Sequence, residues 1–292
     1  MPAILKYGLQ PGLMVGVLTL WYYYHESSWV YLFVVVFLQV LLGALEYRWP
    51  ARPEWVHAPR YKGALVGVFI LTYLFGLFFA DPANAATVNA ALSELRENLG
   101  LDIWPTHWPL VAQAVLALFC SEFIWYWLHR AEHASQWLWR LSAHGSHHAF
   151  QNLGAINAGA NHPLEILLVL ALPSAIVELL FGAGAAVGGS YLLLLTLAFL
   201  AHSNLDLNSK VIGWLFTTNR HHIHHHSVKI DESNTNFGCA VILWDRVFGT
   251  FRDAYTVQTG TGPTQPSLWN IFLMPLREPE DTQTAPRNNA AD

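Results

Sequence analysis

Charged side chains are scarce in this sequence. Its 292 residues include 15 Lys and Arg and 20 Asp and Glu, 12% of the chain, whereas about 25% is usual in soluble proteins. Cysteine is rarer still, and the two present, Cys120 and Cys239, are too few for a disulfide scaffold. A net charge of -5 and a hydrophobic content of 53% argue against a nucleic-acid-binding protein and against disorder. The composition favours a membrane protein.

Long apolar stretches support this interpretation. A membrane-spanning helix needs about 20 predominantly apolar residues. Six stretches are apolar and nearly free of charge, at 13–24, 29–45, 63–80, 109–128, 164–181 and 191–201. The third, fourth and fifth are the strongest candidates, because the first and last are short. We expect about four spanning helices, followed by a helical hairpin over 164–201.

Loop charges orient this array. The loop at 46–62 contains three arginines and one lysine, whereas the loop at 81–107 contains Arg96 alone against four acidic residues. Basic loops remain in the cytoplasm, so the first loop is predicted to be cytoplasmic and the second to lie outside. The fourth stretch then brings the chain to the cytoplasmic edge at His129.

Histidine is unusually abundant beyond that point. The chain has 15 histidines, of which 12 lie between His129 and His226. They form three clusters: HRAEH at 129–133, HGSHH at 144–148, and the run HHIHHH at 221–226. Spacings of three and four residues bring side chains to one helical face. The third cluster contains two overlapping HxxHH frames, and periodicity does not choose between them.

Clustered imidazoles suggest a metal site. So many neighbouring histidines cannot all be charged, and neutral imidazole is a good ligand for zinc, copper, iron and nickel. Eight or nine ligands exceed the four that one tetrahedral zinc accepts, which argues for two metal ions. Two irons with open positions for O2 would form an oxygen-activating centre, and copper is the main competitor on ligand type.

The clusters resemble those of a known family. HRAEH, HGSHH and the third HxxHH, followed by Asn236-Phe-Gly and Trp244-Asp-Arg, are similar to the motifs of the fatty acid hydroxylase/sterol desaturase superfamily, which are membrane di-iron oxygenases. The likeness covers roughly 121–252. Of the two frames in the third cluster, the resemblance implies the one formed by His222, His225 and His226. It also adds the histidine at the end of the last membrane segment. The implied metal ligands are His129, His133, His144, His147, His148, His202, His222, His225 and His226.

Other residues near these motifs are candidates for supporting roles. Asp206 stands where some relatives carry a further histidine, so either it supplies an oxygen ligand or the site has one imidazole fewer, and Asn204 is a similar candidate. His221 and His224 are expected beside the ligands. His162 is expected to orient ligands or to line the substrate cavity.

Acidic residues are candidates to hydrogen-bond the outer nitrogens of metal-bound imidazoles. Glu122 is the most informative, because an acid within an apolar helix normally faces the bundle interior. An interhelical hydrogen bond unrelated to the metals is an equal alternative for it. The other acids available for this role are Glu132, Glu165, Asp231 and Asp245.

The expected fold is an all-α integral membrane bundle with a cytoplasmic helical cap that carries the dimetal site. Residues 1–128 would form the N-terminal membrane helices, 129–255 the fatty acid hydroxylase-type catalytic region, and 256–292 a C-terminal tail. A multi-pass location in a bacterial inner membrane or an ER-type membrane is expected, with the active site facing the cytoplasm.

The resemblance implies an O2-dependent monooxygenase that hydroxylates a membrane lipid, an acyl chain or a sterol-like substrate. Desaturation on the same site is the alternative reaction, and a histidine-rich metal transporter is the alternative class. The implied cofactor is a pair of iron ions, which zinc can replace in recombinant protein. Because the sequence contains no haem-binding, dinucleotide-binding or iron–sulfur motif, a separate ferredoxin, cytochrome or reductase is expected to supply electrons.

Overall fold

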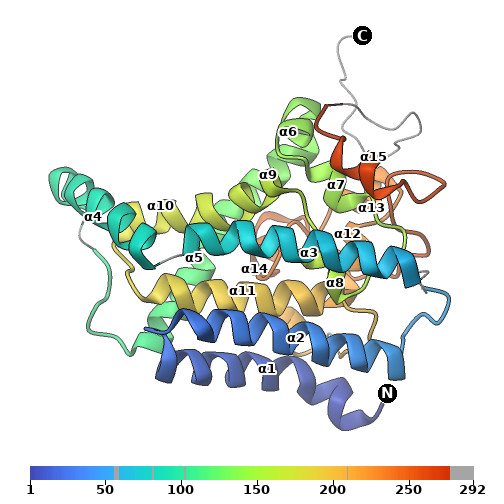
Figure 1. Ribbon diagram of the computed structural model, residues 1–292, viewed down its shortest axis with the longest axis horizontal. Helices are drawn as coiled ribbons and strands as arrows, with labels where there is room; N and C mark the ends of the chain where they lie inside the picture. The colour runs from blue at the N-terminus through green and yellow to red at the C-terminus, as the bar shows by residue number, and fades with distance from the viewer. Residues whose placement is uncertain (56–58, 81, 102, 209, 277–292) are drawn as a thin grey trace.

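The computed structural model describes residues 1–55, 59–80, 82–101, 103–208 and 210–276. Over these residues the chain is helical, and its only strand-like feature is an isolated bridge between Ser227 and Thr259. The expected all-α class is therefore confirmed for the described part of the chain. The order of elements is shown in Figure 1.

The first five helices are long, and those that follow are mostly short. The long helices are α1 (Ala3–Tyr24), α2 (Ser28–Arg48), α3 (Pro59–Ala80), α4 (Pro82–Leu99) and α5 (Leu110–Ala134). The rest are α6 (Gln136–Leu141), α7 (His144–His148), α8 (Ala155–Gly159), α9 (Pro163–Ile166), a π-helical segment (Leu167–Ala171), α10 (Leu172–Phe181), α11 (Ala186–His202), a 3-10 turn (Ile212–Trp214), α12 (Asn219–His225), α13 (Ile230–Ser233), α14 (Leu243–Phe248) and α15 (Leu268–Phe272).

Three of the described helices, α1, α2 and α5, are long and apolar enough to cross a membrane. The first was expected to be short, but α1 begins at Ala3 and continues through Pro11, so it has 22 residues. The stretch 164–181 was expected to be a strong span, but it changes from α to π helix and back, and α10 has only 10 residues. The predicted span 63–80 lies within α3, where several side chains are outside the described residues.

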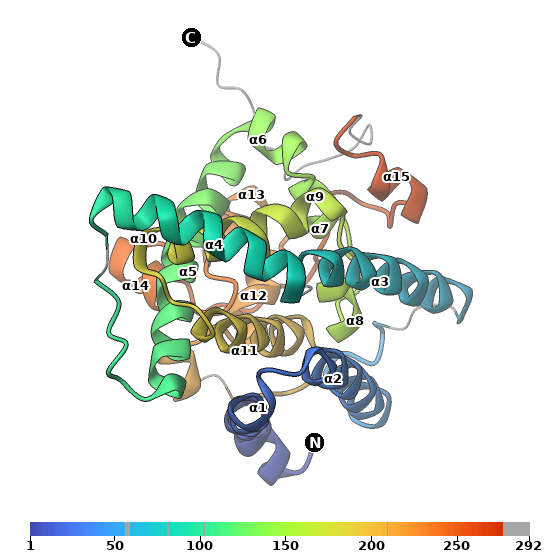
Figure 2. The same ribbon diagram turned by 60° about the vertical axis from the view of Figure 1, so that its left-hand side comes forward.

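Helix α11 is the centre of the bundle. It packs against α5, α1, α2 and α8, and Figure 1 shows α1, α2 and α11 lying side by side. Figure 2 shows α5 passing one end of α11 at a steep angle. The contact is close at Gly189, where a Cβ would lie 2.7 Å from the Trp21 ring and 2.8 Å from Ala114 Cβ. Glycine at this position thus allows three helices to meet.

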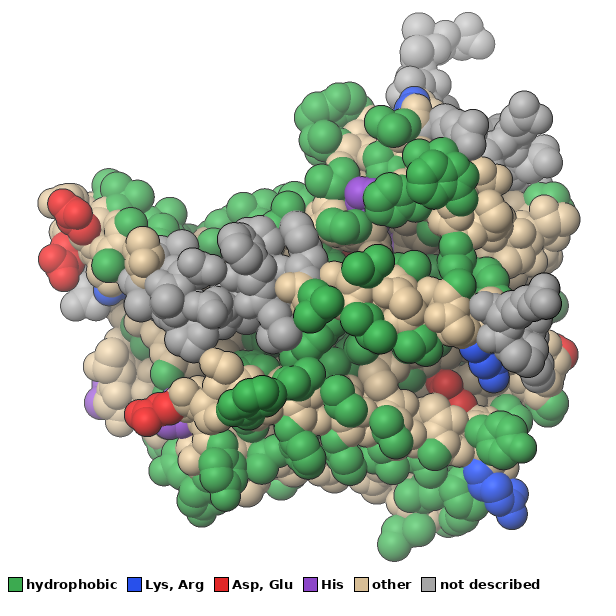
Figure 3. Space-filling model, in the orientation of Figure 1, with side chains coloured by type: hydrophobic (Ala, Val, Ile, Leu, Met, Phe, Trp, Pro, Cys, Tyr) green, Lys and Arg blue, Asp and Glu red, His purple; other side chains and the backbone are tan. Residues whose placement is uncertain are grey.

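The outer faces of the long helices are apolar. Val15 in α1, Val40 in α2 and Leu71 in α3 expose 67%, 68% and 69% of their surface. Figure 3 shows hydrophobic side chains spread over this face of the molecule. Water disfavours such a surface and a bilayer favours it, so we treat α1, α2 and α5 as membrane-spanning.

The short helices and loops of the second half of the chain pack together at the C-terminal ends of α5 and α11. Part of the expected tail belongs to this region, because Ser146 Oγ donates to Ile271 O (2.8 Å) and Thr259 Oγ1 donates to Gln151 O (2.7 Å). Residues 277–292 of that tail lie outside the described residues. Arg52, from the loop expected to be cytoplasmic, donates to Thr256 O at 2.6 Å. The basic loop and the short helices therefore lie at the same edge of the bundle.

Glu122 fastens this region to α5. Its buried carboxylate accepts hydrogen bonds from the backbone N–H groups of Ala240 (2.6 Å) and Val241 (2.9 Å). Among the residues that the structure describes, it forms no hydrogen bond to a histidine. Of the two roles considered for Glu122, a structural hydrogen bond unrelated to the metals agrees with these contacts. The bond joins α5 to a loop and not to a second helix.

Replacing Glu122 therefore tests a structural role. We predict that Glu122→Ala lowers the free energy of unfolding by about 2 kcal/mol, because two buried N–H groups lose their acceptor. Glu122→Gln keeps one carbonyl oxygen and should retain most of the stability. Thermal unfolding of the purified protein, followed by tryptophan fluorescence, measures the difference, with Glu97→Ala on the surface of α4 as the control. An Ala variant as stable as the wild type would contradict the assignment.

Candidate metal centre

The nine histidines expected as metal ligands come from four segments of the chain. His129 and His133 lie one turn apart at the end of α5, and three more come from the five-residue helix α7. His202 is the last residue of α11. The remaining three lie in α12 and at its C-terminal cap, His226. All nine side chains are buried.

The structure brings these nine rings into two groups. Within each group the nearest nitrogen atoms all lie within 4.8 Å of one another. The first group, which we call the five-histidine group, contains His129, His133, His144, His148 and His225. The second, the four-histidine group, contains His147, His202, His222 and His226.

Distances within the groups match those between ligands of one ion. Two nitrogens bound to a metal at about 2.0–2.1 Å, at angles of roughly 90–109°, lie roughly 2.9–3.4 Å apart. In the five-histidine group, His144 Nε2 lies 2.9 Å from His129 Nε2 and 3.0 Å from His133 Nε2. In the four-histidine group, His202 Nε2 lies 3.3 Å from His147 Nε2 and 3.0 Å from His222 Nε2.

The opposite ring nitrogen is held by an oxygen acceptor in six of the nine rings. Such outer hydrogen bonds orient metal-binding imidazoles and direct the other nitrogen inward. The acceptors for Nδ1 are Phe237 O for His129, Asn234 Oδ1 for His133, Glu165 Oε1 for His144, Asn161 Oδ1 for His147, Ala198 O for His202 and Thr235 O for His225.

Burial keeps the imidazoles uncharged. Loss of solvent lowers the pKa of His147 to about 4 and the pKa of His225 to about 3. At neutral pH each ring then has a nitrogen lone pair available for a cation. Both ring nitrogens of His148 are buried without a hydrogen-bond partner among the described residues, an arrangement that a bound cation would relieve. The donor set therefore fits transition-metal ions.

Aromatic rings enclose the five-histidine group. Trp125 stacks on His129 with ring centroids 4.9 Å apart. Trp139 lies edge-on to His133 and His144, with centroids 5.1 Å away in both cases. These rings exclude water from one side of the site.

Two residues considered as ligands lie elsewhere. Asp206 is half exposed and forms an ion pair with Lys6 at 2.6 Å, which favours the alternative that the site has one imidazole fewer. The chain leaves the helix after His202, and a residue four positions later therefore no longer shares its face. Asn204 accepts from Arg52 N (2.9 Å) and donates to Arg52 O (2.9 Å), which ties it to the basic loop.

The three remaining histidine candidates also lie outside both groups. His221 contacts Thr218 Oγ1 at 3.2 Å, and His224 contacts Thr256 Oγ1 at 2.7 Å. Both are buried in α12, in the same short helix as His222 and His225. His162 accepts from Leu164 N and caps α9, with its ring against Phe272.

The Asn-Phe-Gly and Trp-Asp-Arg motifs meet next to His129. Asp245 accepts from Phe237 N (2.7 Å) and Gly238 N (2.8 Å), and burial raises the pKa of Asp245 to about 6. Asn236 has a φ of 56°, a left-handed conformation that asparagine tolerates. The turn built in this way presents the Phe237 carbonyl that orients His129.

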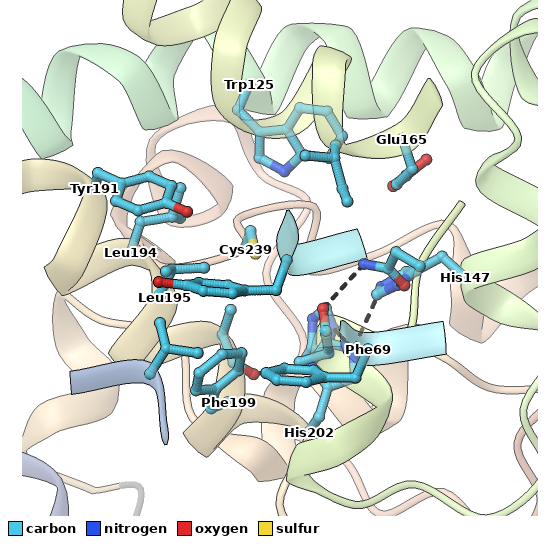
Figure 4. Close-up of a pocket in the computed structure, with 18 of the residues that line it drawn as sticks. Phe69, Trp125, His147, Glu165, Tyr191, Leu194, Leu195, Phe199, His202 and Cys239 are labelled. Atoms are coloured by element: carbon cyan, nitrogen blue, oxygen red, sulfur yellow. Dashed lines mark hydrogen bonds between the residues drawn. The ribbon is translucent and has the colours of Figure 1, made fainter. Parts of the chain in front are cut away.

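An apolar cavity opens beside the two groups. Its walls come from α2, α3, α5, α8, α9 and α11, and five of the grouped histidines line it: His129, His144, His147, His202 and His222. Figure 4 shows His147 and His202 on one side and Tyr191 on the opposite side. The space between them is lined largely by apolar side chains, including Phe69, Leu194, Leu195 and Phe199.

Comparison with known proteins agrees with this site. Residues 114–250 match the family model described as fatty acid hydroxylase. The chain is similar to ornithine lipid hydroxylase OlsE of Rhizobium tropici, with 36% identity over 173 residues, 58% of this chain and 48% of that protein. No solved structure matches it significantly.

Two further relatives are more distant. Very-long-chain aldehyde decarbonylase GL1-8 of Oryza sativa subsp. indica is 32% identical over 158 residues, 50% of this chain and 55% of that protein. Alkylglycerol monooxygenase of Xenopus tropicalis is 24% identical over 242 residues, 78% of this chain and 47% of that protein. The chain spans about half the length of the curated relatives it matches.

The matched region contains both histidine groups, the turn at Asn236 and the carboxylate of Asp245. The motifs on which the resemblance was based are therefore the residues that build the site. The family match and the similarity to the Rhizobium lipid hydroxylase both support the fatty acid hydroxylase/sterol desaturase superfamily.

Proposed function

We propose that this protein is an O2-dependent lipid hydroxylase whose nine grouped histidines hold two iron ions. The observation that carries the proposal is the pair of imidazole groups, five and four, facing an apolar cavity. Two relatives are named as a lipid hydroxylase and as an alkylglycerol monooxygenase, and these names favour hydroxylation. Desaturation on the same site remains the alternative reaction.

Among the metals that bind imidazole, the number of ligands favours iron. Iron commonly takes six ligands, so five and four imidazoles leave positions on each ion for O2. When bound, the iron pair supplies reductive activation of O2 and cleavage of an unactivated C–H bond. Zinc accepts imidazole equally well and can occupy the groups in recombinant protein.

The residues of the chain hold this chemistry in place. Outer hydrogen bonds, such as that from His144 to Glu165 at 2.9 Å, restrict ring rotation. Trp125 and Trp139 cover the rings and limit access of water. The cavity walls of α3 and α11 receive the apolar part of a lipid and bring one carbon to the histidines.

Fixed rings also argue against metal transport. A transporter releases its ion alternately to two sides of the membrane, usually from a site near the bilayer midplane. Here six rings are anchored by hydrogen bonds, and His202 is bonded to the backbone of its own helix at 2.8 Å. An anchored site is suited to a resident cofactor.

The proposed placement has the basic loop and the short helices facing the cytoplasm, in a bacterial inner membrane or an ER-type membrane. The lipid then enters from the bilayer. Each turnover consumes two electrons, which a separate ferredoxin, cytochrome or reductase would deliver at the cytoplasmic face.

Metal analysis tests the ligand assignment. We predict that protein purified without oxygen contains about two iron ions per chain, one in each group. His225→Ala and His222→Ala, one from each group, should lose iron and activity together. His162→Ala lies outside both groups and should keep the wild-type iron content. Full iron content in both ligand variants, or equal loss in His162→Ala, would refute the assignment.

Lipid analysis tests the reaction. Mass spectrometry of membranes from cells with and without the protein should reveal lipids that have gained one oxygen atom. Loss of two hydrogens would instead indicate desaturation. Cells that make the His225→Ala variant are the control. They contain the protein but should not carry out the reaction. No change in any lipid would count against an enzyme of this class and in favour of transport.

A further inference from the structure

Two hydrogen-bond donors in the cavity wall are buried and have no partner among the described residues. They are the indole Nε1 of Trp125 and the hydroxyl of Tyr73. A buried N–H or O–H group without an acceptor is costly, so each marks a position where a bound molecule can supply one. The unpartnered Oε2 of Glu165 also lines the cavity, but that carboxylate already orients His144.

Trp125 is the donor beside the metal centre. Its ring stacks on His129 with centroids 4.9 Å apart. Figure 4 shows its indole nitrogen pointing toward the interior of the cavity. The Tyr73 hydroxyl is a separate position on α3, where the Tyr73 ring stacks on Phe69 with centroids 6.3 Å apart.

The chemistry of the wall limits what the indole N–H can bind. The described residues that line the cavity include neither lysine nor arginine. One neutral donor does not compensate for burying a carboxylate or phosphate, and an N–H group repels a cation. The matching partner is an uncharged oxygen acceptor on an otherwise apolar molecule.

We infer that the substrate is a lipid with an ether, ester or amide oxygen close to the oxidised carbon, and that the Trp125 indole binds this oxygen. The inference rests on the proposed lipid hydroxylase and adds a specificity-determining residue to it. Since the indole lies against His129, an oxygen hydrogen-bonded to Nε1 holds the neighbouring carbons next to the five-histidine group. A plain hydrocarbon chain would lack this anchor.

Paired probes test the inference by binding alone. Hexadecylglycerol ether is compared with the eicosanediol in which a methylene replaces the ether oxygen, and equivalent pairs are made for an ester and an amide. Binding of each radiolabelled probe to the purified full-length protein in lipid nanodiscs is measured without reductant, so that no turnover occurs. For at least one pair, the wild type should bind the oxygen-containing probe about tenfold more tightly.

Trp125→Phe keeps an aromatic ring on His129 and removes only the N–H. We predict that it binds both members of that pair equally. Trp127→Phe makes the same change on α5 at a side chain that is 43% exposed and does not line the cavity, and it should keep the tenfold preference. Iron content measured in all three proteins separates loss of the hydrogen bond from damage to the metal centre.

The inference is overturned if the wild type binds the members of every pair equally, or if Trp125→Phe keeps the preference. If Trp125→Phe does not fold, the wild-type comparison alone still decides, because the inference requires that preference. A preference that depends on Trp125 in a protein that hydroxylates nothing would refute the proposed reaction but not the lipid site. Hydroxylation without such a preference would refute the role of Trp125 only.

Discussion

Nine neutral imidazoles packed against one another are the constraint on which the rest of this structure depends. Charged, they would repel one another and could not be buried. Uncharged, they direct lone pairs toward two shared points, and a cation at each point resolves the repulsion between those lone pairs. Burial in a bundle with few charged residues keeps the rings neutral. The low charge of the chain and its many histidines are therefore parts of one arrangement.

The surrounding segments serve mainly to orient these rings. Glu122 and Asp245, the acids on α5 and α14, bind backbone N–H groups and shape the loop between α13 and α14. That loop supplies carbonyl acceptors to His129 and His225. These carboxylates therefore affect the histidine groups indirectly, through the backbone that they position. The cavity, lined by helices that also form the membrane bundle, completes the site on its open side.

Helical spacing and the family resemblance were sufficient to name the nine histidines that the structure brings together, but not their division into two groups. Each HxxHH motif contributes to both groups, because His147 and His225 lie apart from the other histidines of their own motifs. Several other features depend on contacts between distant segments and could not be predicted in this way. The carbonyls of Ala198, Thr235 and Phe237 carry no side-chain signal, and Asn161 and Asn234 lie in loops. The two alternatives at Asp206 could not be separated from the sequence, because they depend on where the helix ends, and α11 ends at His202, four residues earlier. The apolar stretch 164–181 gave no indication of its π-helical segment.

The central claim is that the two groups hold a pair of neighbouring irons. The most direct measurement is Mössbauer spectroscopy of the reduced protein loaded with iron-57, combined with integer-spin electron paramagnetic resonance. The account predicts two ferrous sites in equal amounts that are magnetically coupled to each other. A single uncoupled iron site, or iron that is lost in favour of one zinc per chain, would contradict it.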